Sequence, residues 1–162
     1  MSRMIRFATI AGLVLIWATT GSVSAQSPNT YTTISVTDIT SGAPVVGGLF
    51  TTQVHVSISN SGGGTPTAVQ GVETYIAFDP GIVNVVDFDN NPTNGTQVEI
   101  KTGFFTSVQT GINQVEIPCS TGGSVPGCVH VALSQISGGV TNGSGAIAAI
   151  RWVGVAAGTD WA

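Results

Sequence analysis

The sequence predicts an all-β protein that folds as a two-sheet β-sandwich. Apolar and polar residues alternate with a period of two in every regular segment of the chain. Clusters of Gly, Ser, Asn and Pro separate these segments, and no stretch keeps a helical period. About eight short strands with turns at regular spacing are typical of a sandwich with Greek-key or jelly-roll connections.

The clearest strand has Val54, Val56 and Ile58 on one face and polar residues on the other. The same alternation, weaker in places, recurs along the chain and defines the other strands. They are expected, in chain order, at residues 31–39, 49–60, 69–78, 83–88, 97–105, 114–117, 129–133 and 146–155.

The N-terminal segment has the features of a secretory signal peptide. Arg3 and Arg6 precede an apolar run over residues 7–18, and small residues lead to Ala25. The alternative is an uncleaved membrane anchor, but the run is short for a span of about 20 residues. We therefore expect residues 1–25 to be removed and residues 26–162 to form one secreted domain with no membrane span.

The expected mature chain is acidic. Only Lys101 and Arg151 oppose its eight Asp and Glu residues, so it has no basic patch for nucleic acid. Thr, Ser, Gly and Val are abundant and charged residues are scarce. This composition favours an extracellular β-protein whose surface consists largely of hydroxyl and amide groups.

The two cysteines, Cys119 and Cys128, are predicted to form a disulfide. An even pair in a secreted chain is typical of a disulfide, and the intervening STGGSVPG is flexible enough to close the loop. The alternative is a metal site, but no His or Cys nearby supplies further ligands at a zinc spacing. No metal or cofactor is therefore predicted.

The strand at residues 69–78 ends at Asp79-Pro80 because proline cannot donate to a strand ladder. Pro80 suits the first position of a helical turn, and Asp79 can cap that turn by accepting a backbone N–H. Gly81 eases the reversal, and the chain re-enters the sandwich at once. We interpret Asp79 and Pro80 as a structural turn.

Catalytic patterns are weak. His55 and His130 each stand alone on strand positions, and no G-x-S-x-G motif or facing pair of carboxylates is evident. Residues 87–91 form an oxygen-rich loop that could hold calcium, but it lacks the glycine and distal glutamate of an EF-hand, so a plain turn is favoured. The sequence predicts no enzyme.

Two stretches of the sequence resemble a known family. An apolar strand ending in F-D-P at Phe78, Asp79 and Pro80, followed by IVNVVDF, resembles the cohesin domain of bacterial cellulosomes, and GSGAIAAIRWVGV near the C-terminus agrees with it. The resemblance implies a jelly-roll sandwich over residues 26–162. Carbohydrate-binding modules share this architecture.

The resemblance implies that the partner is a dockerin, a small calcium-binding helical module that docks on one sheet. Cohesins carry an acidic or polar residue six positions before the Asp-Pro aspartate, and Glu73 matches it. Tyr75 and Gly71 share its face, which suits an interface hot spot. Ser134 and Gln135 fall near another part of the family's docking surface.

The chain also departs from the family. The Cys119–Cys128 loop is not a usual cohesin feature, and the sequence stops at AAGTDWA where cohesins continue into a final strand that pairs with the first. We therefore expect a C-terminally truncated domain in which the strand at residues 31–39 lacks one neighbour.

The predicted function is that of a secreted or cell-surface, non-catalytic binding module whose partner is a dockerin-like protein. The alternatives are a carbohydrate-binding module that takes a polysaccharide and a structural spacer in a surface protein. A sugar platform needs exposed aromatic rings. Most aromatic residues take core positions, and only Tyr75 and Trp161 are expected to be free.

Overall fold

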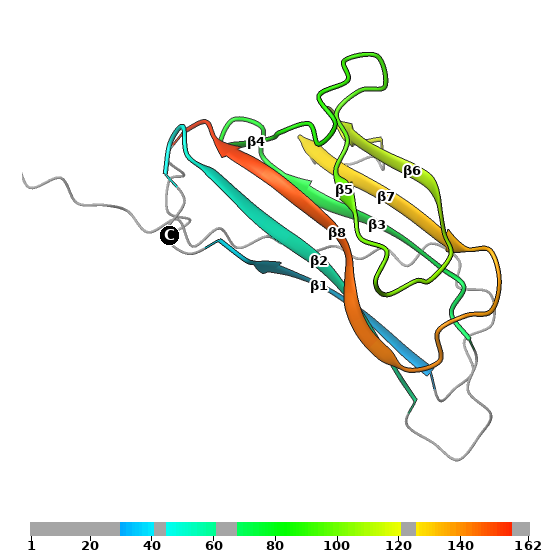
Figure 1. The fold of residues 1–162 in the computed structure, drawn as a ribbon. Coiled ribbons are helices and arrows are strands. Elements are labelled where there is room, and N and C mark those ends of the chain that lie inside the picture. Colours follow the sequence, from blue (N-terminus) through cyan, green and yellow to red (C-terminus); the bar gives the residue numbers. More distant parts are fainter. Residues whose placement is uncertain (1–29, 41–44, 61–67, 121–125, 157–162) are drawn as a thin grey trace, which may run out of the picture.

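The computed structural model describes residues 30–40, 45–60, 68–120 and 126–156. The predicted signal peptide lies outside this part of the chain. The described residues contain strands, turns and no helix, and the strands form two antiparallel sheets that pack together (Figure 1). The predicted all-β sandwich is confirmed.

The larger sheet has the strand order β1-β2-β8-β4, and β5 pairs with β8 as well. We call it the five-stranded sheet. Its strands are β1 (Thr30–Asp38), β2 (Leu49–Asn60), β8 (Gly143–Gly154), β4 (Val83–Val85) and β5 (Glu99–Ile100). Among the described residues, β1 pairs with β2 alone and lies at the edge of this sheet.

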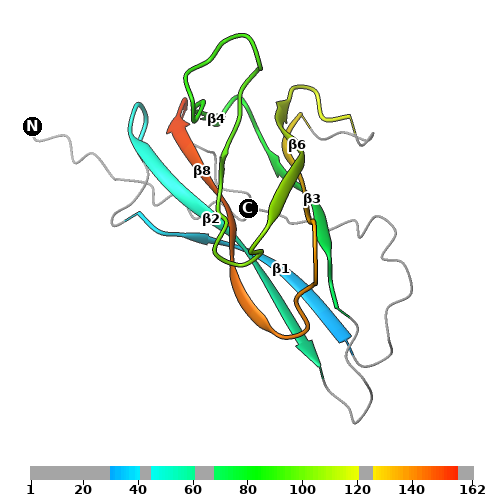
Figure 2. The same ribbon diagram turned by 45° about the vertical axis from the view of Figure 1, so that its right-hand side comes forward.

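The second layer is a three-stranded sheet with β7 at its centre. It consists of β3 (Gly71–Phe78), β7 (Gly127–Gln135) and β6 (Val108–Glu116). Figure 2 shows this layer beside β1, β2 and β8, with the segment between β4 and β5 extending beyond one end of the sandwich. Because β7 pairs with both β3 and β6, residues from three segments of the chain meet on its outer side.

The core lies between the sheets and takes every second residue of β2, β3 and β7. Val54, Val56 and Ile58 of β2 are almost completely buried, as their alternation predicts. Trp152 of β8 packs edge-on against Phe78 of β3, which joins the two layers. Its indole N–H donates to the hydroxyl of Thr52 at 2.8 Å, so this polar group is satisfied inside the core.

The strand ends differ most from expectation in β6 and β5. β6 begins at Val108, six residues before the predicted start at residue 114. The sequence does not reveal this first part, VQTGIN, because it has few apolar residues and contains a bulge. β5 is reduced to two residues. The side chain of Asn113 bonds both backbone groups of Val98, at 3.0 and 2.8 Å, and so holds the segment before β5 against β6.

The turn after β3 has the geometry of a capped turn. Oδ1 of Asp79 accepts the N–H of Gly81 at 2.8 Å, and its carbonyl accepts the N–H groups of Ile82 and Val83. Pro80 supplies no donor at this point. The chain therefore crosses from the three-stranded sheet to β4 of the five-stranded sheet within one tight turn.

The predicted disulfide is confirmed. Cys119, just after β6, is bonded to Cys128 of β7, and their Cα atoms are 5.2 Å apart. Both side chains are buried. The bond ties the chain after β6 to the start of the central strand of the three-stranded sheet.

Replacing Cys119 and Cys128 together by alanine is expected to lower the free energy of unfolding by about 2–3 kcal/mol, because the opened loop regains chain entropy in the unfolded state. Urea unfolding followed by tryptophan fluorescence measures the difference. Wild-type protein reduced beforehand is the matched control and should lose a similar amount. An unchanged free energy in the double variant would contradict a stabilising role for the bond.

Candidate functional site

The outer face of the three-stranded sheet gathers most of the predicted partner-binding residues. On β3, Val72, Thr74 and Ile76 face the core, so Glu73 and Tyr75 face outward. On β7, Val129 and Val131 face the core, so His130 between them faces outward too. Pairing of Tyr75 with His130 and of His130 with Gln114 brings β3, β7 and β6 together at one point.

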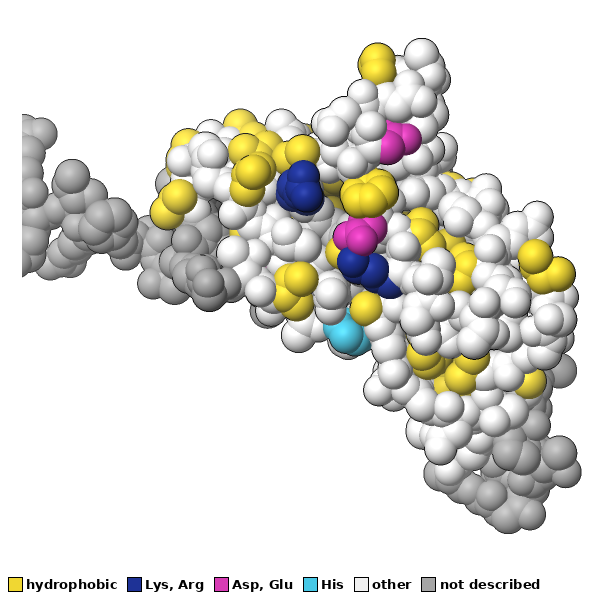
Figure 3. Space-filling view, viewed as in Figure 1, with side chains coloured by type: hydrophobic (Ala, Val, Ile, Leu, Met, Phe, Trp, Pro, Cys, Tyr) yellow, Lys and Arg dark blue, Asp and Glu magenta, His cyan; other side chains and the backbone are white. Residues whose placement is uncertain are grey.

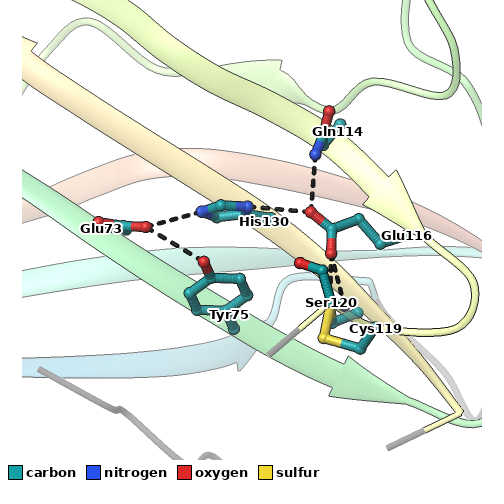
Figure 4. The surroundings of a disulfide bond; sticks show 8 residues. Glu73, Tyr75, Gln114, Glu116, Cys119, Ser120 and His130 are labelled. Carbon is teal, nitrogen blue, oxygen red and sulfur yellow. Dashed lines mark hydrogen bonds and ion pairs between the residues drawn. A yellow bond between two sulfur atoms is a disulfide. The ribbon is translucent and has the colours of Figure 1, made fainter. Parts of the chain in front are cut away.

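His130 lies between two carboxylates from the neighbouring strands (Figure 4). Its Nε2 is 2.9 Å from Oε1 of Glu73, and its Nδ1 is 3.1 Å from Oε1 of Glu116. Although it is on an outer face, His130 is only 5% exposed. We call these three residues the Glu–His–Glu cluster.

Tyr75 covers the imidazole. Its ring stacks on that of His130 with the centroids 3.9 Å apart, and its hydroxyl donates to Oε1 of Glu73 at 3.2 Å. Burial, and then the adjacent Glu73 carboxylate, raise the pKa of Tyr75, so the phenol keeps its proton and remains a donor. Oε1 of Glu73 thus has a polar contact with each of two side chains.

Glu116 joins the cluster to the disulfide loop. Its Oε2 accepts the backbone N–H of Ser120, the residue after Cys119, at 2.8 Å, and its Oε1 accepts from the amide of Gln114 at 2.7 Å. Hydrogen bonding from Ser120 lowers the pKa of Glu116 to about 2, aided by Gln114 and His130 and opposed by burial. Glu116 is therefore a carboxylate at any pH near neutral.

Four of the five residues predicted to bind a partner share this face, and one does not. The side chain of Glu73 is 45% exposed, and Gly71 pairs directly with Ser134 at the other end of β3. Gln135 instead donates to the carbonyl of Ser137 at 2.8 Å and binds the following loop. Neighbouring residues of a strand face opposite ways, so Ser134 and Gln135 cannot share a face.

Sequence reasoning missed the histidine at the centre of this site. His130 stands alone in the sequence but has partners in the fold, because Glu73 and Glu116 contact it from 57 and 14 residues away. The one available signal was its position between the core residues Val129 and Val131, which makes it face outward. Its partners follow only from the strand order β3-β7-β6.

The outer face of the five-stranded sheet carries a second feature. Lys101 and Arg151, the only Lys and Arg among the described residues, both lie on this side, as Figure 3 shows. Lys101 pairs with Glu99 at 2.5 Å. Arg151, Glu99 and the half-exposed ring of Phe88 line a shallow pocket of about 110 Å³.

Phe88 corrects the expectation about free aromatic rings. It is 50% exposed, whereas Tyr75 is stacked on His130 and only partly exposed. Trp161, the other ring expected to be free, lies outside the described residues. The exposed ring was missed because the strand expected at residues 83–88 ends at Val85.

Two clusters contain residue types that can bind metals, and their side chains make other contacts. Glu116, Cys119 and Cys128 bring an oxygen and two sulfurs within 4.8 Å of one another, but the sulfurs are bonded to each other and are not thiolate ligands. In the oxygen-rich loop, Asp89 accepts hydrogen bonds from Asn91 and Asn94, at 2.9 and 2.8 Å. Bonds from Asn94 and then Asn91 lower the pKa of Asp89, as in a plain turn.

No family model matches this chain, and no curated protein or solved structure matches it either. Within the described ranges, no helix is long and apolar enough to cross a membrane. The disulfide is typical of a protein that matures in an oxidising compartment.

Glu116→Gln is expected to change the acid stability of the protein. The pKa of Glu116 is about 2 in the folded state and ordinarily 4.5, so its stabilising effect is complete above about pH 4.5 and is lost as the pH falls toward 2. In that range the variant should take up roughly one proton fewer on unfolding.

Urea unfolding at several pH values between about 2 and 6 measures this proton uptake. Wild-type protein, measured in the same series of pH values, is the reference. If the free energy of unfolding changes with pH by the same slope in Glu116→Gln and in wild type, the contacts of Glu116 do not favour its ionised form.

Proposed function

We propose that this chain is a secreted, non-catalytic binding module that docks a protein partner through the outer face of the three-stranded sheet. One observation carries the proposal: Glu73 is partly exposed, yet its Oε1 is held by both His130 and Tyr75. Its Oε2 has no partner among the described residues. A carboxylate held in this way is an acceptor with a fixed position, which lowers the entropic cost of binding.

The resemblance to cohesins supports a dockerin-like partner. Glu73 is the residue that matches the family's docking acid, and it lies on an outer sheet face together with Tyr75, Gly71 and Ser134. The two-sheet sandwich is compatible with the jelly-roll type that the resemblance implies. The disulfide supports secretion.

The chemistry of the cluster favours binding over catalysis. A general base must reach the proton that it abstracts from a substrate. Both ring nitrogens of His130 already face carboxylate oxygens, and Tyr75 covers the ring. The cluster is therefore suited to holding Glu73 in place.

A polysaccharide is the second candidate ligand, and Phe88 favours it. An exposed aromatic ring beside polar groups can stack on a sugar ring while the polar groups bind its hydroxyls. Phe88, Glu99, Thr51 and Arg151 line one pocket on the five-stranded sheet. This surface is separate from the Glu–His–Glu cluster, so substitutions can distinguish the two functions.

Tyr75→Ala is expected to weaken docking to a dockerin module by more than about 1 kcal/mol, which is roughly fivefold in Kd, because it removes a ring at the proposed interface and a bond to Glu73. Calorimetry of the mature domain with a panel of calcium-loaded dockerin modules measures the change. Glu73→Gln should weaken the same complex.

Phe88→Ala is the matched control and should leave this complex unchanged. The same variants are tested by affinity electrophoresis against a panel of polysaccharides. If polysaccharide binds and Phe88→Ala abolishes it, while no dockerin binds the wild-type domain, the glycan function replaces the docking function.

A further inference from the structure

The contacts of the Glu–His–Glu cluster raise the question of how many protons the imidazole of His130 carries. A hydrogen bond requires one proton between each ring nitrogen and its carboxylate oxygen, and His130 makes such a contact on both sides, at 2.9 and 3.1 Å. A neutral imidazole has one N–H and one lone pair, so one contact would place that lone pair against a carboxylate. An imidazolium donates to both.

The surroundings of the ring favour the charged form. Glu73 and Tyr75 face it from β3, and Glu116 and Gln114 from β6. The neighbouring Cys119–Cys128 pair is a disulfide and does not titrate. Lys101 and Arg151 lie on the opposite side of the sandwich. Among the described residues, His130 is therefore the only group on this face that can balance two carboxylates.

We propose that His130 is a positioning residue, held as an imidazolium, whose Nε2–H fixes the Glu73 carboxylate for the partner, so that docking weakens when the ring loses its second proton. This inference rests on the proposed function. The partner contributes a hydrogen-bond donor to the free oxygen of Glu73, and a partner carboxylate is disfavoured, because the cluster keeps one net negative charge.

The direction of the pH dependence follows from the contacts. When the pH rises and the imidazolium releases a proton to solvent, one of its two carboxylate bonds is lost and the two acids repel each other. The proposal requires the remaining N–H to stay on the Glu116 side, so that Glu73 then keeps a hydrogen bond only from Tyr75. In mild acid the Glu116 contact persists, because the pKa of that carboxyl is about 2. Docking should therefore weaken toward alkaline pH.

The charge state is tested without a partner. A long-range ¹H–¹⁵N correlation spectrum of the ¹⁵N-labelled mature domain reports the protonation of each ring nitrogen. At about pH 6.5 we expect both nitrogens of His130 to be protonated. His55, whose Nε2 contacts the amide oxygen of Gln53 at 3.1 Å, gives the second histidine signal and serves as the internal reference.

Glu116→Gln and Glu73→Gln should each lower the pH at which the second proton of His130 is lost, because each removes one facing carboxylate. A spectrum of a single neutral tautomer of His130 at about pH 6.5 would overturn the proposal, as would an unchanged titration in both variants.

The docking step is tested with His130→Gln, which keeps one amide donor in the cluster. We expect this variant to bind the dockerin module about tenfold more weakly and to lose the fall in affinity between about pH 6 and 8. His55→Gln is the control and should keep both the wild-type affinity for the dockerin module and its pH dependence. Circular dichroism at each pH verifies that the variants are folded.

If His130→Gln does not fold, wild-type affinity across the same pH range decides the matter, since a flat profile contradicts the proposal. If no dockerin binds wild type, the proposed function fails and the docking role of His130 fails with it. An imidazolium in the spectrum would then still establish the charge state. A single neutral tautomer beside a dockerin that does bind would refute this inference alone.

Discussion

The contact of His130 with one carboxylate on each neighbouring strand is the interaction on which the outer face of the three-stranded sheet depends. It links β3, β7 and β6 by side chains in addition to their backbone pairing. On the β6 side the link continues through Glu116 to the N–H of Ser120 beside the disulfide. The disulfide loop and the proposed docking acid, Glu73, thus belong to one continuous network.

The fold could be predicted from sequence where one face of a strand is buried and the other is not. Val54, Val56 and Ile58 define β2 in this way, and the alternation around Glu73 sets its outward direction. Where both sides are polar the pattern fails, and β6 was placed six residues too late for that reason. Its bulge between Thr110 and Ile112 interrupts the period as well.

The candidate site was only half predictable. Glu73, Tyr75 and the disulfide follow from local signals: strand parity, a resemblance to a family's motif and an even cysteine pair. The role of His130 depends on which strands are neighbours, and a strand order of β3-β7-β6 has no signature within a single segment. The exposure of Phe88 likewise depends on where β4 ends, and strand ends are the weakest part of any such prediction.

The proposed positioning of Glu73 requires that His130 and Glu116 stabilise each other as a charged pair. A double-mutant cycle of His130→Gln and Glu116→Gln, measured by urea unfolding at about pH 6, tests it most directly. We predict a coupling free energy of about 1–3 kcal/mol, as for hydrogen bonds between charged groups. Effects that add within about 0.5 kcal/mol would show that the two residues do not form such a pair, because residues that act independently show no coupling.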